Sequence, residues 1–205
     1  MKEKFVITVG RQLGSGGRDI AHIIGERLGI KVYDRELINE AARKSGLNPE
    51  LFEHADEKAP LHLPLVGALT ADISATSILS SYINNDTLFG LQSQTIRELA
   101  SRESCIVIGR CADYVLREQP NVLSTFITAS ESDRINRIMR HTGTTAQEAT
   151  TSMRQTERKR AAYYNYYTFK TWGAAESYDI TLNSSVAGVE KCAEIIIGLA
   201  ESVLD

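Results

Sequence analysis

A glycine-rich stretch near the amino terminus has the residue types that bind phosphate. The segment FVITVGRQLGSGGRDIAHIIGERLG, residues 5–29, passes from an apolar run through a glycine-rich turn into a helical pattern. The small residues Gly14, Ser15, Gly16 and Gly17 allow backbone N–H groups to turn inward around an anion, and the following helix adds the positive end of its dipole. The stretch therefore predicts an anion site at a strand–loop–helix junction.

The loop departs from the standard phosphate-loop pattern GxxxxGK[ST], in which the lysine reaches the outer phosphates and the hydroxyl binds magnesium. With Gly16 as the second glycine, the lysine position falls on Gly17 and the hydroxyl position on Arg18; with Gly17 as the second glycine, they fall on Arg18 and Asp19. The first register better fits the helix that follows, and the second keeps a cation. Arginine also binds phosphate strongly, although its planar fork differs from an ammonium group. We therefore expect Arg18 to be the replacement cation, with Arg11 as the second choice; a tight turn without a ligand is the alternative.

Two further positions after apolar runs carry side chains suited to a ligand. Arg110 follows the run Cys105–Ile108, and the carboxyl ends of buried parallel strands are the usual place for ligand contacts in an open α/β sheet. Asp34 follows Ile30–Tyr33 and is interpreted either as a helix N-cap or as a contact to a phosphate acceptor or to magnesium. Arg35 is a weaker candidate for the acceptor phosphate.

A later segment, RQTERKRAAYYNYYTFKTW, gathers basic and aromatic side chains over residues 154–172. Arg154 and Arg158 lie four residues apart and share a helical face, which can close onto phosphates and exclude water as lids do. Arginines interleaved with aromatic rings also occur in single-stranded nucleic-acid sites, and a solvated helix with a tyrosine-packed end is a further alternative. No motif identifies a magnesium ligand. The candidates are Asp19, Asp34 and Asp113, and Asp113 can equally point into solvent from its helix.

The elements that position these side chains alternate between strands and helices. Short apolar, β-branched runs predict buried parallel strands, and apolar residues three and four apart predict helices. This order indicates an α/β domain with a parallel sheet. The predicted strands are Phe5–Val9, Ile30–Tyr33, Cys105–Ile108, Val122–Thr128 and Tyr178–Leu182. The predicted helices are Arg18–Leu28, Arg35–Lys44, Arg110–Arg117, Ser130–His141, Thr144–Tyr164 and Val189–Leu204.

The stretch between about residues 48 and 99 follows a different pattern. Pro60 and Pro64 interrupt it, and residues 65–79 mix small and apolar side chains. We interpret the stretch as a mainly helical insertion that covers a substrate site. Its apolar face can equally form a homodimer interface, and the sequence does not choose between the two.

Composition excludes some functional classes. With 23 basic and 26 acidic residues the net charge is −3, which argues against a general nucleic-acid binder. The three cysteines have no CxxC spacing and indicate buried, reduced thiols of a reducing compartment. The start MKEKFVITVG has too short an apolar run for a signal peptide or a membrane span, which needs about 20 apolar residues. We expect a cytoplasmic protein with neither nucleic acid nor membrane as partner.

Several ordered segments resemble the cytidylate kinase-like family of P-loop proteins. They are VGRQLGSGGRDIA, VYDRELINEAARKSGL, CIVIGRCADYVL, YYNYYT and YDITLNSS. The resemblance implies one domain over residues 1–205 with a three-layer α/β/α P-loop nucleotide-kinase-like fold, and a lid-like arginine-rich region at about residues 144–172. It also implies that Arg110 corresponds to an arginine that contacts the nucleoside monophosphate, and that Tyr33-Asp34-Arg35 begins the acceptor-binding segment. The chain departs from the family pattern at the loop lysine and at Ile108, where the family has an acidic residue.

The motifs and the resemblance together predict an ATP-dependent phosphotransferase that uses Mg²⁺ and is cytidylate kinase-like. Its acceptor is expected to be a nucleoside monophosphate such as CMP or dCMP, or a similar small molecule. The expected catalytic residues are Arg18, Arg154 and Arg158; ATP is expected at Arg11, Gly14, Ser15, Gly16, Gly17, Arg18 and Asp19, and the acceptor at Asp34, Arg35 and Arg110. Two alternatives stand beside this prediction: a non-catalytic nucleotide-binding regulatory module, and a kinase for a non-nucleotide metabolite.

Overall fold

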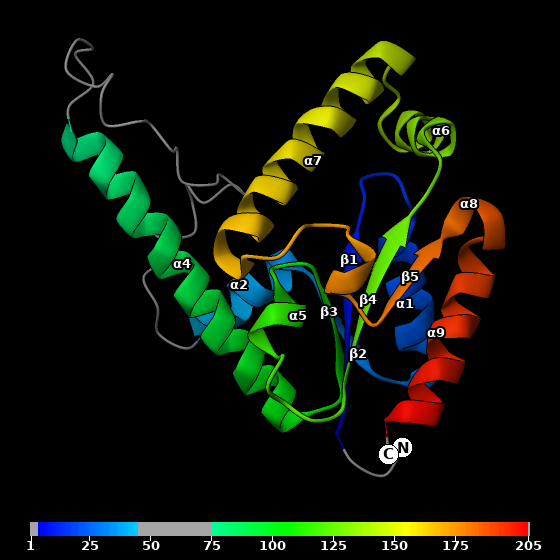
Figure 1. The fold of residues 1–205 in the computed structure, drawn as a ribbon, viewed down its shortest axis with the longest axis horizontal. Helices are drawn as coiled ribbons and strands as arrows, with labels where there is room; N and C mark the ends of the chain where they lie inside the picture. The colour runs from blue at the N-terminus through cyan, green and yellow to red at the C-terminus, as the bar shows by residue number, and fades with distance from the viewer. Residues whose placement is uncertain (1–3, 45–74, 205) are drawn as a thin grey trace.

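Five apolar strands form one parallel sheet in the computed structural model, which describes residues 4–44 and 75–204. Within these residues the strand order is β2-β3-β1-β4-β5, so that β1 lies at the centre (Figure 1). The strands are β1 (Val6–Arg11), β2 (Lys31–Tyr33), β3 (Cys105–Ile108), β4 (Val122–Thr128) and β5 (Ile180–Asn183).

The central strand brings the ends of its neighbours to one edge. Val9 of β1 pairs with Ile108 of β3 and with Thr125 of β4, and Arg11 pairs with Ile127. The loop after β1, the turn after β3 and the loop after β4 therefore leave the sheet side by side. Ligands bind outside the carboxyl ends of strands in open α/β sheets, and this edge is where the site must be sought.

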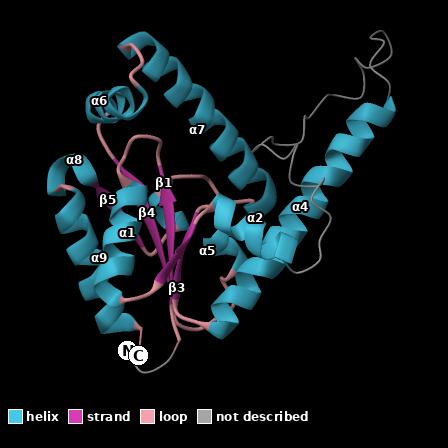
Figure 2. Cartoon of the chain, turned by 180° about the vertical axis from the view of Figure 1, so that it is seen from behind, coloured by secondary structure: helices cyan, strands magenta, loops and turns pink. Residues whose placement is uncertain are grey.

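Helices cover both faces of the sheet, as Figures 1 and 2 show. On one face α1 (Gly17–Leu28) and α9 (Val189–Val203) pack with Ile7 and Val9 of β1 into the larger core cluster. On the other face α2 (Arg35–Lys44), α4 (Ala75–Arg102) and α5 (Ala112–Val115) pack around Val6 and β3. Alternate residues of a strand point to opposite faces, so the continuous apolar run of β1 supplies both cores. The predicted three-layer α/β/α fold is confirmed.

Two helices lie over the carboxyl end of the sheet (Figure 1). Helix α6 (Glu131–Thr142) begins after Ser130, whose side chain accepts a hydrogen bond from the Asp133 N–H. Helix α7 (Ala146–Thr168) begins with a capping box between Thr145 and Glu148. The remaining turns are a short 3₁₀ helix, η2 (Ala175–Ser177), and α8 (Ser184–Ala187).

The structure corrects several predicted boundaries. The predicted helix Arg110–Arg117 is wrong at its start, because Gly109, Arg110 and Cys111 have φ angles of 73°, 56° and 53° and no helix can run through them. Helix α7 runs four residues past the predicted end, to Thr168, and β5 begins two residues late because η2 precedes it.

The predicted insertion is only partly visible. Residues 48–74 lie outside the described part of the chain, and from Ala75 onward the stretch is helical, within α4. In the carboxyl-terminal half of α4, Phe89 stacks on Tyr167 of α7 with ring centroids 4.0 Å apart. Among the described helices, none is both long and apolar enough to cross a lipid bilayer.

Candidate functional site

The glycine loop connects β1 to α1 and has the conformation that its sequence predicts. Gly14 and Gly16 both have φ of 78°, a region that residues with a side chain rarely adopt. A Cβ on Gly14 would also lie 2.6 Å from the Arg134 carbonyl oxygen. Since α1 begins at Gly17 with Gly16 as its N-cap, the structure agrees with the register in which Gly17 stands at the lysine position.

The loop carbonyls are all held by hydrogen bonds, so the backbone conformation is fixed. Five consecutive carbonyl oxygens, those of residues 11–15, accept a side-chain hydrogen bond. The donors are Arg160 to Arg11 (3.1 Å), Ser15 to Gln12 (2.9 Å), Arg134 to Leu13 (3.0 Å), Arg137 to Gly14 (2.6 Å) and Ser184 to Ser15 (2.6 Å). Within the described residues, no hydrogen bond from the N–H groups of Gly14, Gly16 or Gly17 is found. These N–H groups and the amino end of α1 provide the donors that an anion requires.

Two arginines of α6 support the loop. Arg134 is buried, with a side chain 6% exposed, and pairs with Glu157 of α7 as well as with the loop. Arg137 lies beside Gly16, where a Cβ would come within 3.4 Å of its Nη1. The sequence predicted the helix Ser130–His141 but gave Arg134 and Arg137 no role. A role could have been inferred from their positions, because the two arginines lie three residues apart on a helix that follows the carboxyl end of β4.

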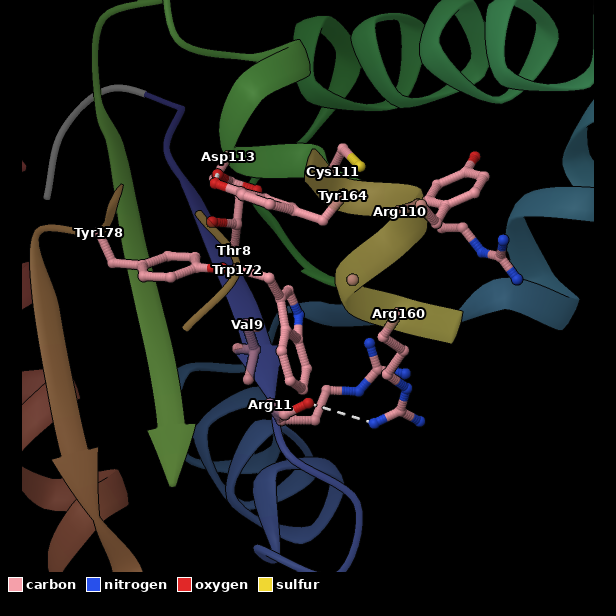
Figure 3. Close-up of a pocket in the computed structure, with 13 residues that line it drawn as sticks. Thr8, Val9, Arg11, Arg110, Cys111, Asp113, Arg160, Tyr164, Trp172 and Tyr178 are labelled. Carbon is pink, nitrogen blue, oxygen red and sulfur yellow. Dashed lines mark hydrogen bonds between the residues drawn. The ribbon is translucent and has the colours of Figure 1, made fainter. Parts of the chain in front are cut away.

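A small pocket opens next to the loop, between β1, the turn after β3 and α7 (Figure 3). Its volume of about 40 Å³ leaves room for only a few water molecules. It is basic at one end, acidic at the other, and aromatic between them. The lining residues are Thr8, Val9, Gly10, Arg11, Gly109, Arg110, Cys111, Asp113, Arg160, Tyr163, Tyr164, Trp172 and Tyr178.

The basic part of the pocket is built from three elements. Arg11 ends β1, Arg110 belongs to the turn after β3, and Arg160 comes from α7. Arg110 is buried, with its guanidinium carbon 5.9 Å from the centre of the Tyr163 ring. Three guanidinium groups around one small pocket favour an anionic ligand, because each presents several N–H donors without an acceptor.

The opposite end holds a carboxyl group among tyrosines (Figure 3). The Tyr164 hydroxyl donates to Asp113 Oδ2 at 2.6 Å. Burial raises the pKa of Asp113 above its usual range, and the hydrogen bond from Tyr164 opposes part of that rise. Burial likewise raises the pKa of Tyr164 and of Tyr178. The alternative in which Asp113 points into solvent is wrong.

The structure places Arg18 and Asp34 together, away from the lining of the pocket. Arg18 Nη2 lies 2.5 Å from Asp34 Oδ2, and the Arg18 side chain is 63% exposed. The other Asp34 oxygen accepts from the N–H groups of Glu36 and Leu37 at 3.1 and 3.2 Å. The predicted N-cap role of Asp34 is therefore confirmed. Asp19 and Arg35 are exposed at the starts of α1 and α2.

The arginine-rich segment contributes Arg160 to the lining of the pocket, and not Arg154 or Arg158, which were expected to be catalytic. Arg154 is exposed and its Nη2 lies 3.2 Å from Glu131 of α6, and Arg158 is also exposed. Neither lines the pocket, whereas Arg160 does. Helical spacing correctly put Arg154 and Arg158 on one face, but it could not tell which face of α7 meets the sheet.

The described carboxylates near the site are already engaged and offer no evident magnesium site. Asp34 is engaged by its helix cap and by Arg18, and Asp113 by Tyr164 in a setting that disfavours its charge. Among the residues of known placement, no cluster of three acidic, histidine or cysteine side chains could hold a metal. These residues do not fit a magnesium ion held by the protein alone, and we derive no step through the metal.

Comparison with known proteins agrees with this geometry. The profile of the cytidylate kinase-like family matches residues 6–186. A cytidylate kinase from Archaeoglobus fulgidus is 25% identical over 202 residues, which cover 95% of this chain and 94% of that protein. The crystal structure of an uncharacterized protein from Eubacterium ventriosum has a TM-score of 0.74 at 25% identity, covering 97% of this chain and 99% of the other. A shikimate kinase from Bacteroides thetaiotaomicron shares the fold, with a TM-score of 0.53 at 12% identity over 96% of this chain and 98% of its own.

The parallel sheet, the glycine loop and the pocket at the carboxyl edge define a P-loop kinase-like α/β protein. Within that class, the chain belongs to the cytidylate kinase-like family.

Proposed function

We propose that this chain is a nucleotide kinase-type phosphotransferase, which moves the terminal phosphate of ATP to a nucleoside monophosphate. The observation that carries the proposal is that Arg11, from which the glycine loop continues, lines the pocket together with Arg110 and Arg160, and that Arg160 also donates to the Arg11 carbonyl oxygen. We take the loop and this pocket as two neighbouring anion sites. Phosphoryl transfer requires chiefly that two anionic substrates be held in line while moving charge is neutralised. Membership of the cytidylate kinase-like family supports the same reaction.

In this proposal the loop holds the ATP phosphates, and Arg110 and Arg160 of the pocket hold the acceptor phosphate. An oxygen of the acceptor phosphate forms the new bond to the γ-phosphorus. The bond from that phosphorus to the bridging oxygen of ATP breaks, and its electron pair leaves with ADP. The products are ADP and a nucleoside diphosphate, and the attacking phosphate oxygen has no proton to lose when it is ionised.

The chain supplies position and charge for this step. Gly14, Gly16 and Gly17 offer N–H donors to the ATP phosphates, and Arg110 and Arg160 offer guanidinium donors to the acceptor. Magnesium would enter with ATP, since it is commonly held by phosphate oxygens and water with few protein ligands. Arg18, Arg154 and Arg158 remain proposed participants, and would reach phosphate only after leaving Asp34 or after a movement of α7.

The acceptor is proposed to be CMP or dCMP. The relative from Archaeoglobus fulgidus is named a cytidylate kinase, and the pocket has a basic end with aromatic and hydrogen-bonding groups at the other. The pocket volume is smaller than a nucleotide needs, so the proposal requires α7 and the Trp172 segment to move apart on binding. A binding-only module on the same fold is the second candidate, because Gly17 stands where the standard loop has its lysine.

Purified protein incubated with ATP, Mg²⁺ and each of CMP, dCMP, UMP, AMP and GMP tests the proposal through ADP release. We expect turnover with CMP or dCMP, and a background rate without acceptor. The Arg110→Ala variant should raise the KM for the acceptor about 10-fold or more, since a charge-assisted hydrogen bond contributes about 1.5–3 kcal/mol. ATP binding without turnover would instead favour the binding module, and turnover only with another metabolite would indicate a non-nucleotide acceptor.

A further inference from the structure

The lysine position of the loop is filled by the side chain of another residue. A Cβ on Gly17 would lie 2.6 Å from Cβ of Arg11 and 3.2 Å from its Cγ. Gly17 is not among the residues with positive φ, so its backbone conformation would accept any residue. It is the stem of Arg11, lying across the first residue of α1, that requires glycine here.

The alternation of β1 explains how Arg11 reaches this place. Ile7 and Val9 point toward α1 and belong to the core on that face. Arg11 is two residues further along the strand and therefore leaves β1 on the same side. Its stem passes over Gly17, at the point where a lysine side chain would start.

The guanidinium group of Arg11 lies between the loop and the pocket. A Cβ on Gly109 would come 2.1 Å from Arg11 Nη1, so the head group lies directly over the turn after β3. Figure 3 shows Arg11 and Arg160 beside each other at one end of the pocket, with Asp113 at the other. Arg11 thus begins at the donor loop and ends among the groups proposed to hold the acceptor.

We propose that Arg11 supplies the cation that lysine supplies in the standard phosphate loop. Gly17, which has no side chain, leaves the space that the Arg11 stem occupies. The proposal rests on the proposed function and names a further catalytic residue for it. The other arginines are less suited: Arg18 pairs with Asp34, and Arg134 and Arg137 donate to loop carbonyls.

The use of an arginine in place of the standard lysine has a chemical consequence. A planar guanidinium presents two edges of N–H donors, whereas an ammonium is a point charge. Placed between the two sites, Arg11 can donate to the terminal phosphate of ATP and to the acceptor phosphate together. It stabilises the charge on the oxygens of the moving phosphoryl group, and donates no proton to either product.

The test measures binding of a non-hydrolysable ATP analogue and of ADP alongside turnover. Arg11→Met keeps the stem over Gly17 and removes the charge. The variant should bind the ATP analogue roughly 10- to 100-fold more weakly than the wild type, and its affinity for ADP should fall by less. Arg27→Ala is the matched control, because Arg27 lies on the same α1 helix and its ion pairs, with Glu190 and Glu194, are both exposed. It should bind both nucleotides like the wild type.

A second pair of variants moves the cation back to its standard place. Arg11→Gly removes the Cβ that would meet a side chain at position 17, and should lose affinity as Arg11→Met does. Adding Gly17→Lys to Arg11→Gly should recover most of the lost affinity for the ATP analogue. Recovery of binding also shows that the loop of the double variant is folded.

Three results are decisive. Wild-type affinity of Arg11→Met for the ATP analogue, or no gain on adding Gly17→Lys, would remove Arg11 from this role. Arg11-dependent binding of the analogue without turnover would retain Arg11 as the phosphate cation and refute the proposed catalysis. A wild-type protein that binds no ATP would overturn both.

Discussion

The Arg134 guanidinium donates from Nε to the Leu13 carbonyl oxygen at 3.0 Å, and so ties α6 to the phosphate loop. Its Nη2 pairs with Glu157 of α7. One buried arginine therefore connects the loop with both helices that lie over the carboxyl end of the sheet. The conformation of the loop depends on residues more than a hundred positions later in the chain.

Removing the carboxylate from this pair should destabilise the fold and the loop. Glu157→Ala leaves the Arg134 charge buried without its carboxylate, and breaking a buried pair in this way costs about 3–5 kcal/mol. We expect a drop of that order in the free energy of unfolding in urea, together with weaker ATP binding. The matched control is Glu118→Ala, which removes an 84% exposed partner of Arg117 and should cost at most about 1 kcal/mol. Equal costs for the two variants would contradict a structural role for the Arg134–Glu157 pair.

Gly14 should tolerate no side chain. Gly14→Ala carries the cost of a left-handed residue, about 1–2 kcal/mol, and also brings a Cβ to 2.6 Å from the Arg134 carbonyl oxygen. Gly143→Ala is the control, because Gly143 has φ of 70° with nothing within 4 Å of its Cβ position. Thermal unfolding and ATP titration should show both variants destabilised, but only Gly14→Ala impaired in ATP binding. Normal ATP affinity of Gly14→Ala would place the anion elsewhere.

The partly buried carboxyl of Asp113 should make stability depend on pH. Because its pKa is raised in the folded state, its favourable contribution is complete below the unfolded pKa and is lost as the pH rises through the folded pKa. Asp113→Asn keeps an oxygen that accepts from Tyr164 and cannot ionise. The variant should therefore gain stability relative to the wild type as the pH is raised, measured by urea unfolding at several pH values. A difference in stability between the two proteins that stays constant, or that moves in favour of the wild type as the pH rises, would contradict a raised pKa for Asp113.

Features that rest on local residue pattern were predictable from the sequence. The five strands were placed within two residues at each end, because buried parallel strands are short, apolar and β-branched. The cap at Asp34 and the left-handed glycines of the loop follow from residue types with few conformational alternatives.

Features that rest on distant contacts were not predictable in the same way. The left-handed conformations of Arg110 and Cys111 contradict their helical pattern, and such strained residues persist only where the surrounding structure fixes them. Helical spacing grouped Arg154 with Arg158 but could not orient α7, which turns Arg160 to the pocket. The choice of Arg18 as the loop cation followed from its position next to the glycines. The contact of Arg11 with Gly17 needed the three-dimensional path of β1 into α1.

The most direct test of the central claim is the product balance of one reaction. Protein, ATP, Mg²⁺ and CMP are incubated together, and ADP and CDP are quantified by chromatography, with dCMP in a parallel sample. Transfer between the loop and the pocket predicts that ADP and the nucleoside diphosphate appear in equal amounts and that both require the acceptor. ADP formed without a nucleoside diphosphate, or no ADP at all although ATP is bound, would contradict the account.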